Sequence, residues 1–199
     1  MRQSDCSMRN ILTSLREEII RLRSQNADNQ KFIDIPRFRE ILTEEITHNA
    51  LLACGFLPHQ CREYTVRIRN EAFRIFALLL YLESPWLIGP FLEHSIHDIP
   101  VRKEQLSELS VELGEQFKSG FLTKQLAFKP HFFHRGRFAR VDPSAVLPIV
   151  KKNELDELEG SFGAISEIVI APSFHDFFDT KVRQQCCNRP RLKPLSDMC

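Results

Sequence analysis

The spacing of apolar residues in the first part of the chain predicts an amphipathic helix over Met8–Arg23. Apolar side chains recur there every three or four positions, as one face of an α-helix requires, and charged side chains occupy the other faces. The apolar positions are Met8, Ile11, Leu12, Leu15, Ile19 and Leu22. Such a helix can form a short coiled coil, bind a partner or pack on its own domain, and only about two heptads fit. The polar stretch Ser24–Lys31 predicts a linker after it.

Three further helices are predicted from the same kind of pattern. The first begins near Asp34, since a proline two residues later is tolerated in a first helical turn, and Gly55 ends it. The second, Cys61–Leu82, becomes apolar on nearly all faces, which predicts a position at the centre of a helical bundle. Trp86–Phe91 follows as a packed apolar turn, and the third helix covers Arg102–Phe117.

Aromatic and basic residues are interleaved around and after Gly120, and they predict an extended linker over residues 121–145. The residues in question are Phe117, Phe121, Phe128, Phe132, Phe133 and Phe138 with Lys118, Lys124, Lys129, Arg135, Arg137 and Arg140. This mixture can bind single-stranded nucleic acid by stacking and phosphate contact. Linkers between folded parts also use aromatic anchors, and the chain has no recognised nucleic-acid motif. Nucleic acid is therefore not the expected partner.

Two runs of strand-forming residues predict a β-hairpin near the end of the chain. Leu147–Val150, extended by Leu155 and Leu158, supplies the first strand, and Ile165–Ile170 supplies the second. The predicted fold class is mainly α, with a helical bundle-like domain at residues 8–120, the linker at 121–145 and an incomplete hairpin at 146–178. The basic, proline-containing tail at 179–199 has no periodic apolar face, so we expect it to be disordered.

Composition excludes little and indicates an ordinary globular protein. The chain has 199 residues, 43% of them hydrophobic, and a formal net charge of +1, so it has no global bias toward nucleic acid or membrane. Its longest apolar run, Ile75–Leu82, is too short to cross a bilayer, and the amino terminus does not resemble a secretory signal. We expect a cytoplasmic or nuclear protein with no membrane span.

The cysteines and histidines do not form a recognisable metal motif. The cysteines contain no Cys-x-x-Cys pair, so reduced thiols are expected. The pairs His94/His97 and His131/His134 have a spacing that can place two imidazoles on one helical turn. A structural zinc site needs four ligands, and no nearby cysteine or carboxylate cluster completes either pair. Histidines of the surface or of turns are the favoured interpretation.

The most specific candidate chemistry lies between the two predicted strands. A nucleotide-covering kinase loop has the pattern G-x-G-x-x-G-x-V, in which glycines allow the backbone amides to approach the ATP phosphates. Leu158 occupies the first glycine position. The candidate nucleotide-binding residues are Gly160, Ser161, Phe162, Gly163 and Ile165. The alternative is that this Gly-x-x-Gly is only the turn of a hairpin.

Several segments in a consistent order support the kinase interpretation. They are Gln125–Phe133, Val146–Ile149, Glu159–Ile168 and Ile170–Phe177, with an upstream echo at Phe91–Val101. Together they resemble a group of fungal protein-kinase-like proteins, over roughly residues 70–178. The resemblance implies a helical amino-terminal region followed by the first hairpin of a kinase amino lobe. It also implies that a full-length relative binds ATP and Mg²⁺ and phosphorylates serine or threonine.

The resemblance stops before the catalytic elements of a kinase. Those elements are a third-strand lysine, the helix-C glutamate, a His-Arg-Asp loop with its asparagine, and an Asp-Phe-Gly metal ligand. His134–Gly136 lacks the aspartate and precedes the glycine loop, His175–Phe177 is not followed by glycine, and Lys181 has no Val-Ala-x-Lys context. We therefore expect no catalytic residue and no cofactor in this chain, and no kinase activity from it alone.

Two functions follow as expectations. In the first, the chain is a truncated kinase-like protein, for which a truncated gene model is one explanation, and its helical domain binds an unknown protein partner. In the second, the chain is a helical protein-interaction module that binds no nucleotide. Nucleotide-dependent stabilisation distinguishes them, because a ligand that binds only the folded state raises the melting temperature.

Overall fold

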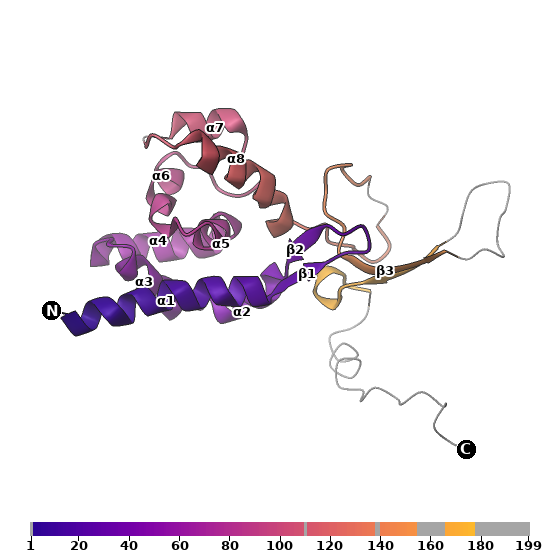
Figure 1. The fold of residues 1–199 in the computed structure, drawn as a ribbon, viewed down its shortest axis with the longest axis horizontal. Coiled ribbons are helices and arrows are strands. Elements are labelled where there is room, and N and C mark those ends of the chain that lie inside the picture. The colour runs from indigo at the N-terminus through magenta and orange to yellow at the C-terminus, as the bar shows by residue number, and fades with distance from the viewer. Residues whose placement is uncertain (1, 110, 138–139, 155–165, 178–199) are drawn as a thin grey trace, which may run out of the picture.

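The computed structural model describes residues 2–109, 111–137, 140–154 and 166–177, which form a mainly helical body with two small antiparallel β-hairpins (Figure 1). The predicted fold class, mainly α with a hairpin near the end, is confirmed. The helices are α1 (Arg2–Arg21), α2 (Ile35–Ile41), α3 (Glu44–Ala53), α4 (Pro58–Asn70), α5 (Phe73–Tyr81), α6 (Ile88–Glu93), α7 (Lys103–Glu108) and α8 (Glu115–Lys124). The 3-10 helices are η1 (Pro85–Leu87), η2 (Gln125–Phe128) and η4 (Pro172–Phe174). The strands are β1 (Arg23–Gln25), β2 (Lys31–Ile33), β3 (Ile149–Glu154) and β4 (Ser166–Ile170).

The predicted amphipathic helix is α1, and its apolar face packs within the chain. Leu15, Ile19 and Leu22 are buried in the main core, where α1 lies against α3 and α5. The helix begins earlier than predicted and ends at Arg21, because the chain then enters β1. Among the three options that the sequence left open, packing on its own domain is the one that this structure contains.

The single helix predicted from Asp34 to Gly55 is wrong, because the chain breaks after α2. The side chain of Thr43 accepts a hydrogen bond from the backbone N–H of Ile46 at 3.3 Å and so begins a new helix, α3. The carbonyl oxygen of Leu42, before this cap, accepts a hydrogen bond from the Arg69 guanidinium at 2.7 Å. Gly55, at φ +90°, ends α3 as predicted, since glycine adopts this left-handed conformation without a steric penalty.

The helix predicted over Cys61–Leu82 is also divided in two. α4 ends at Asn70, and α5 begins at Phe73 after a break at Glu71 and Ala72. Every residue of α5 from Ile75 to Leu80 is buried, which confirms its predicted place in the centre of the helical body. A helix that is apolar on all faces needs neighbours on every side, and α1, α4, α6 and η2 supply them.

The predicted helix over Arg102–Phe117 is wrong at its carboxyl end. α7 stops at Glu108, and α8 starts at Glu115 and continues to Lys124, directly followed by η2. The start of the predicted extended linker is therefore helical. Its Phe121 and Phe128 are core residues, 0% and 1% exposed, and Phe121 stacks on Phe91. These two rings are not available to stack on nucleic-acid bases.

The polar stretch predicted as a linker over Ser24–Lys31 is instead a β-hairpin. β1 and β2 pair antiparallel, with Arg23 opposite Ile33 and Gln25 opposite Lys31. Phe32 points to the face of this hairpin opposite to that of Lys31 and Ile33, since neighbouring residues of a strand point to opposite faces. Ile33 belongs to the main core and Phe32 to a second, smaller core with Val146 and Phe174. The hairpin therefore joins the helical body to the carboxyl-terminal part of the chain.

Candidate functional site

The predicted second hairpin is formed by β3 and β4, which extend away from the helical body (Figure 1). Their antiparallel register runs from the Ile149–Ile170 pair to the Glu154–Ser166 pair. The chain between these last two residues carries all the candidate nucleotide-binding residues, and it lies outside the described residues. Those residues are Gly160, Ser161, Phe162, Gly163 and Ile165. The predicted hairpin is thus confirmed, and the glycine loop stays a prediction.

The first strand differs from its prediction in position. β3 begins at Ile149 and continues through the polar residues Lys151 and Lys152, where the sequence has little strand preference. Pairing with the β-branched residues of β4 forms the strand there. The predicted contributions of Leu155 and Leu158 fall outside the described residues, as does the tail at 179–199.

The base of the β3–β4 hairpin is fixed by hydrogen bonds within the hairpin and from the β1–β2 turn. Ala171 donates its N–H to the carbonyl of Pro148 at 2.8 Å. Ala27, in the β1–β2 turn, donates its N–H to the carbonyl of Ile149 at 2.7 Å. The buried side chain of Asn26 donates to the carbonyl of Leu147 at 2.9 Å. The two hairpins are therefore joined at the base of β3.

A small apolar core and one polar contact complete this anchorage. Phe32 and Phe174 meet edge to face with their ring centroids 5.5 Å apart, beside Val146. Ser173, in η4, donates its hydroxyl to Asp34 at 2.8 Å, and the other carboxylate oxygen of Asp34 caps α2. The carboxyl-terminal segment is thus held against both the β1–β2 hairpin and the amino terminus of α2.

Farther from this base, apolar side chains of the hairpin are open to solvent. Val150, Ile168 and Val169 are 43%, 43% and 45% exposed. Ile168 and Val169 are neighbours in β4 and so face opposite sides of the sheet, while Val150 lies at a bulge between the paired residues of β3. Nearly half of each of these side chains is open to solvent in the described part of the chain, which leaves a two-stranded sheet with exposed apolar side chains on both faces.

The structure brings together two short segments that the sequence left apart, His134–Gly136 and His175–Phe177. Asp176 accepts the backbone N–H of Arg135 at 2.5 Å and lies 3.1 Å from Nδ1 of His134. These hydrogen bonds, that of Arg135 first, lower the pKa of the Asp176 carboxyl. The arrangement ties residues 133–135 to residues 174–176, where Phe133 and His175 form a β-bridge. The two segments are far apart in the sequence, so only their pairing in space reveals this contact.

The two histidine pairs do not share helical turns. His94 follows the end of α6 and His97 lies in the loop beyond, 3.1 Å from a carboxylate oxygen of Glu71. His131 and His134 lie in irregular extended chain. Within the described ranges, no group of three or more histidine, cysteine, aspartate or glutamate side chains is arranged to hold a metal ion.

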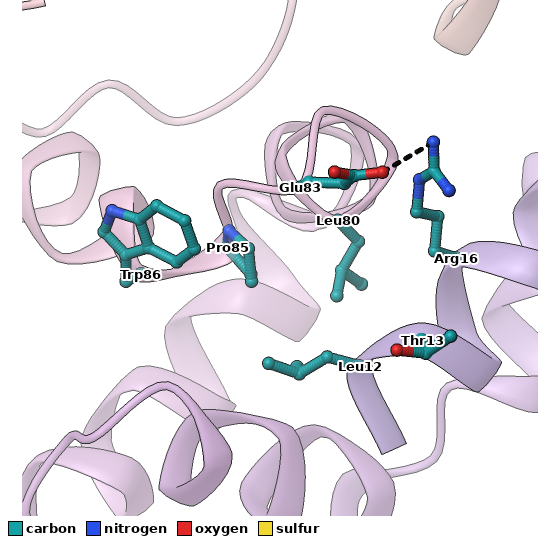
Figure 2. Close-up of a pocket in the computed structure, with 7 residues that line it drawn as sticks. All are labelled: Leu12, Thr13, Arg16, Leu80, Glu83, Pro85 and Trp86. Atoms are coloured by element: carbon teal, nitrogen blue, oxygen red, sulfur yellow. Dashed lines mark ion pairs between the residues drawn. The ribbon is translucent and has the colours of Figure 1, made fainter. Parts of the chain in front are cut away.

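A recess on the helical body is the second candidate site (Figure 2). Leu12 on α1, Leu80 on α5 and Pro85 point into a cavity of about 330 Å³. Arg16 and Glu83 form an ion pair of 2.7 Å at its rim. The cavity is large enough for one or two apolar side chains of a partner.

Trp86 lies beside this recess and differs from its prediction. The sequence predicts a packed apolar turn over Trp86–Phe91, whereas η1 and α6 form there and Trp86 is 53% exposed. Phe91 and Leu92 of the same stretch are buried. The indole is therefore the exposed member of an otherwise buried segment, and large exposed aromatics of this kind are frequent at protein interfaces.

No helix in the described part of the chain is both long and apolar enough to cross a membrane.

No protein-family model, curated protein or solved structure matches the chain.

Proposed function

We propose that this chain is the front part of a kinase-like protein, in which a helical body holds a nucleotide-covering β-hairpin. The observation that supports the proposal is the register of β3 and β4. It closes the hairpin with the segment that contains Gly160 and Gly163, while the opposite end is fixed to the rest of the chain. A loop that covers ATP needs this combination of a fixed base and glycines at the closing end.

The chemistry of the proposal rests on the backbone. Amides of Gly160–Gly163 donate to the phosphates, and Ile165 covers the adenine, with Mg²⁺ supplied in a full-length relative. The exposed Val150, Ile168 and Val169 are positions that other parts of an amino lobe would cover in such a relative. Because the sequence offers no His-Arg-Asp or Asp-Phe-Gly element, the chain alone is proposed to have no phosphoryl-transfer activity.

The experiment is a thermal unfolding series with ATP. If ATP binds only the folded chain and its concentration is 100 times the dissociation constant, it raises the free energy of unfolding by about 2.7 kcal/mol. Gly160→Val and Gly163→Val remove the close backbone approach, so they should abolish the increase in melting temperature. Gly120→Val is the matched control, because nothing lies within 4 Å of an added Cβ there. The absence of any ATP effect on the unaltered chain contradicts the proposal, and so does an equal effect in all variants.

The Trp86 recess supports a second candidate function, a helical module that binds a protein partner. Exposed tryptophans beside apolar cavities are frequent hot spots, with losses of about 2 kcal/mol or more on truncation. Peptides selected from a displayed library should bind the purified chain at this recess, and Trp86→Ala should weaken them at least tenfold. Leu57→Ala is the matched control, since Leu57 is also exposed, at 56%, and does not line the recess. Equal losses of peptide affinity in both variants would exclude the recess as the binding site.

A further inference from the structure

A second and larger cavity lies where four separate parts of the chain meet. It has a volume of about 570 Å³ and is bounded by the β1–β2 hairpin, the end of α5, the α8–η2 junction and residues 144–146. Cavities of roughly 300–1,000 Å³ are typical of small-molecule sites in proteins. This cavity shares no lining residue with the recess at Trp86, none of its lining residues belongs to the glycine loop, and neither proposed function uses it.

The charge around the cavity is one-sided. Arg23 on β1, Lys31 on β2 and Lys124 on α8 all line it, and no aspartate or glutamate does. None of these three cations forms an ion pair with a carboxylate in the described part of the chain. The nearby carboxylate of Asp142 accepts the N–H and hydroxyl of Ser144, at 2.8 and 2.7 Å. The positive charge of the cavity is therefore not neutralised from within.

The strand register explains why two of the cations share one side. Arg23 pairs with Ile33, and Lys31 pairs with Gln25, so all four side chains lie on one face of the β1–β2 hairpin. Phe32, on the opposite face, is fixed in the second core. Because that ring holds the hairpin in place, the cationic face keeps its direction toward the cavity.

The floor of the cavity is apolar. Ile33, Phe128 and Val146 are 2%, 1% and 5% exposed and line it from three different segments. Lys124 holds its ammonium 5.3 Å from the centre of the Tyr81 ring, within the distance of a cation–π contact, and Tyr81 also lines the cavity. A cationic rim over an apolar and aromatic floor matches a ligand with an anionic head and an apolar body.

We propose that this cavity binds an amphiphilic organic anion, a phosphate or carboxylate joined to an aromatic or aliphatic body. The guanidinium of Arg23 binds the head through paired N–H donors, and Lys31 and Lys124 add charge at the rim. The body lies on Ile33, Phe128 and Val146. This site would be retained even if ATP did not bind at the glycine loop, because none of its residues belongs to that loop.

The test uses small probes that separate the two parts of the ligand. 2-Naphthyl phosphate and 2-naphthoate carry both parts, 2-naphthol lacks the charge, and inorganic phosphate lacks the body. We expect 2-naphthyl phosphate or 2-naphthoate, the two complete probes, to bind at least tenfold more tightly in calorimetry than 2-naphthol and inorganic phosphate do. Its affinity should fall as salt is raised, because exposed charges are screened. Whichever complete probe binds more tightly identifies the head group.

Two variants and one control complete the design. Replacing Arg23, Lys31 and Lys124 together by glutamine should weaken the probe at least tenfold. Thr123→Trp should do the same without a change in charge, since Thr123 is an exposed cavity residue of α8. The matched control replaces Arg37, Arg62 and Lys103, all exposed and outside the cavity, by glutamine. The proposal is overturned if neither complete probe binds, if naphthol binds as tightly, or if the control loses as much affinity as the cavity variants.

Discussion

A buried side-chain amide, that of Asn26, contributes to the contact between the two hairpins and is only 4% exposed. Its oxygen accepts the backbone N–H groups of Asp28 and Gln30, at 3.1 and 2.7 Å. Its nitrogen donates to the carbonyl of Leu147 at 2.9 Å and to the side chain of Gln30 at 3.1 Å. One side chain thus closes the β1–β2 turn and binds the chain just before β3.

Asn26→Ala removes these hydrogen bonds without adding volume. The Leu147 carbonyl and the N–H groups of Asp28 and Gln30 then lose these partners, and a buried polar group without a partner costs about 1–3 kcal/mol. Asp28 and Gln30 are exposed, so water can replace part of their loss. We therefore expect a decrease of about 2–4 kcal/mol in the free energy of unfolding, a large part of the 5–15 kcal/mol that is usual for a domain.

Urea unfolding followed by circular dichroism measures this decrease, and hydrogen exchange at the Ala27 amide gives a local readout. That amide donates to the Ile149 carbonyl, so its exchange should accelerate when the turn separates from β3. Asn49→Ala, on the exposed side of α3, is the matched control and should change stability by less than about 0.5 kcal/mol. If the two variants unfold alike and the Ala27 amide exchanges at its original rate, Asn26 does not join the hairpins and the reasoning is refuted.

Three further predictions concern single groups. The buried Thr65 hydroxyl has no hydrogen-bond partner among the described residues. Thr65→Val should therefore raise the free energy of unfolding, measured by urea unfolding, by up to about 1 kcal/mol. A decrease would show that the hydroxyl has a partner. Burial raises the pKa of the Cys54 thiol to about 12, so mass spectrometry at pH 8 should find it unmodified by a thiol reagent in the native state and modified in urea. The pKa of Asp176 is lowered, first by the Arg135 N–H and then by the His134 side chain. The ionised Asp176 therefore contributes fully to the free energy of unfolding above the ordinary aspartate pKa of about 3.9, and this contribution is lost as pH falls through the lowered value. The Arg135 amide resonance should report that transition in NMR, and Asp176→Asn should remove it.

The sequence alone determined the elements whose pattern is local. Leu15, Ile19 and Leu22 recur at helical spacing, and they are buried along α1 and at the residue directly after it. The β-branched run that ends at Ile170 forms β4, and Gly55 ends α3. Periodicity and conformational preference act over a few residues, so they can be recognised without knowledge of what packs against them.

The tertiary structure decided what depends on distant partners. The β1–β2 hairpin has no apolar alternation, and Asn26 holds it through a carbonyl far along the chain, at Leu147. The polar half of β3 is a strand because β4 pairs with it. No local signal marked the break between α4 and α5, or the burial of Phe121, which sequence alone assigned to an extended linker.

Both cavities are formed by segments that are distant from one another in the sequence. The recess beside Trp86 needs α1 and α5 to meet, and the cationic cavity needs Arg23, Lys31 and Lys124 to come from three elements to one rim. The sequence predicts a glycine loop because its candidate residues are contiguous, whereas the residues of both cavities are scattered along the chain and gave no such signal. A contiguous motif can be read from order alone, whereas a surface built from separated segments exists only once packing and long-range hydrogen bonds have set their positions.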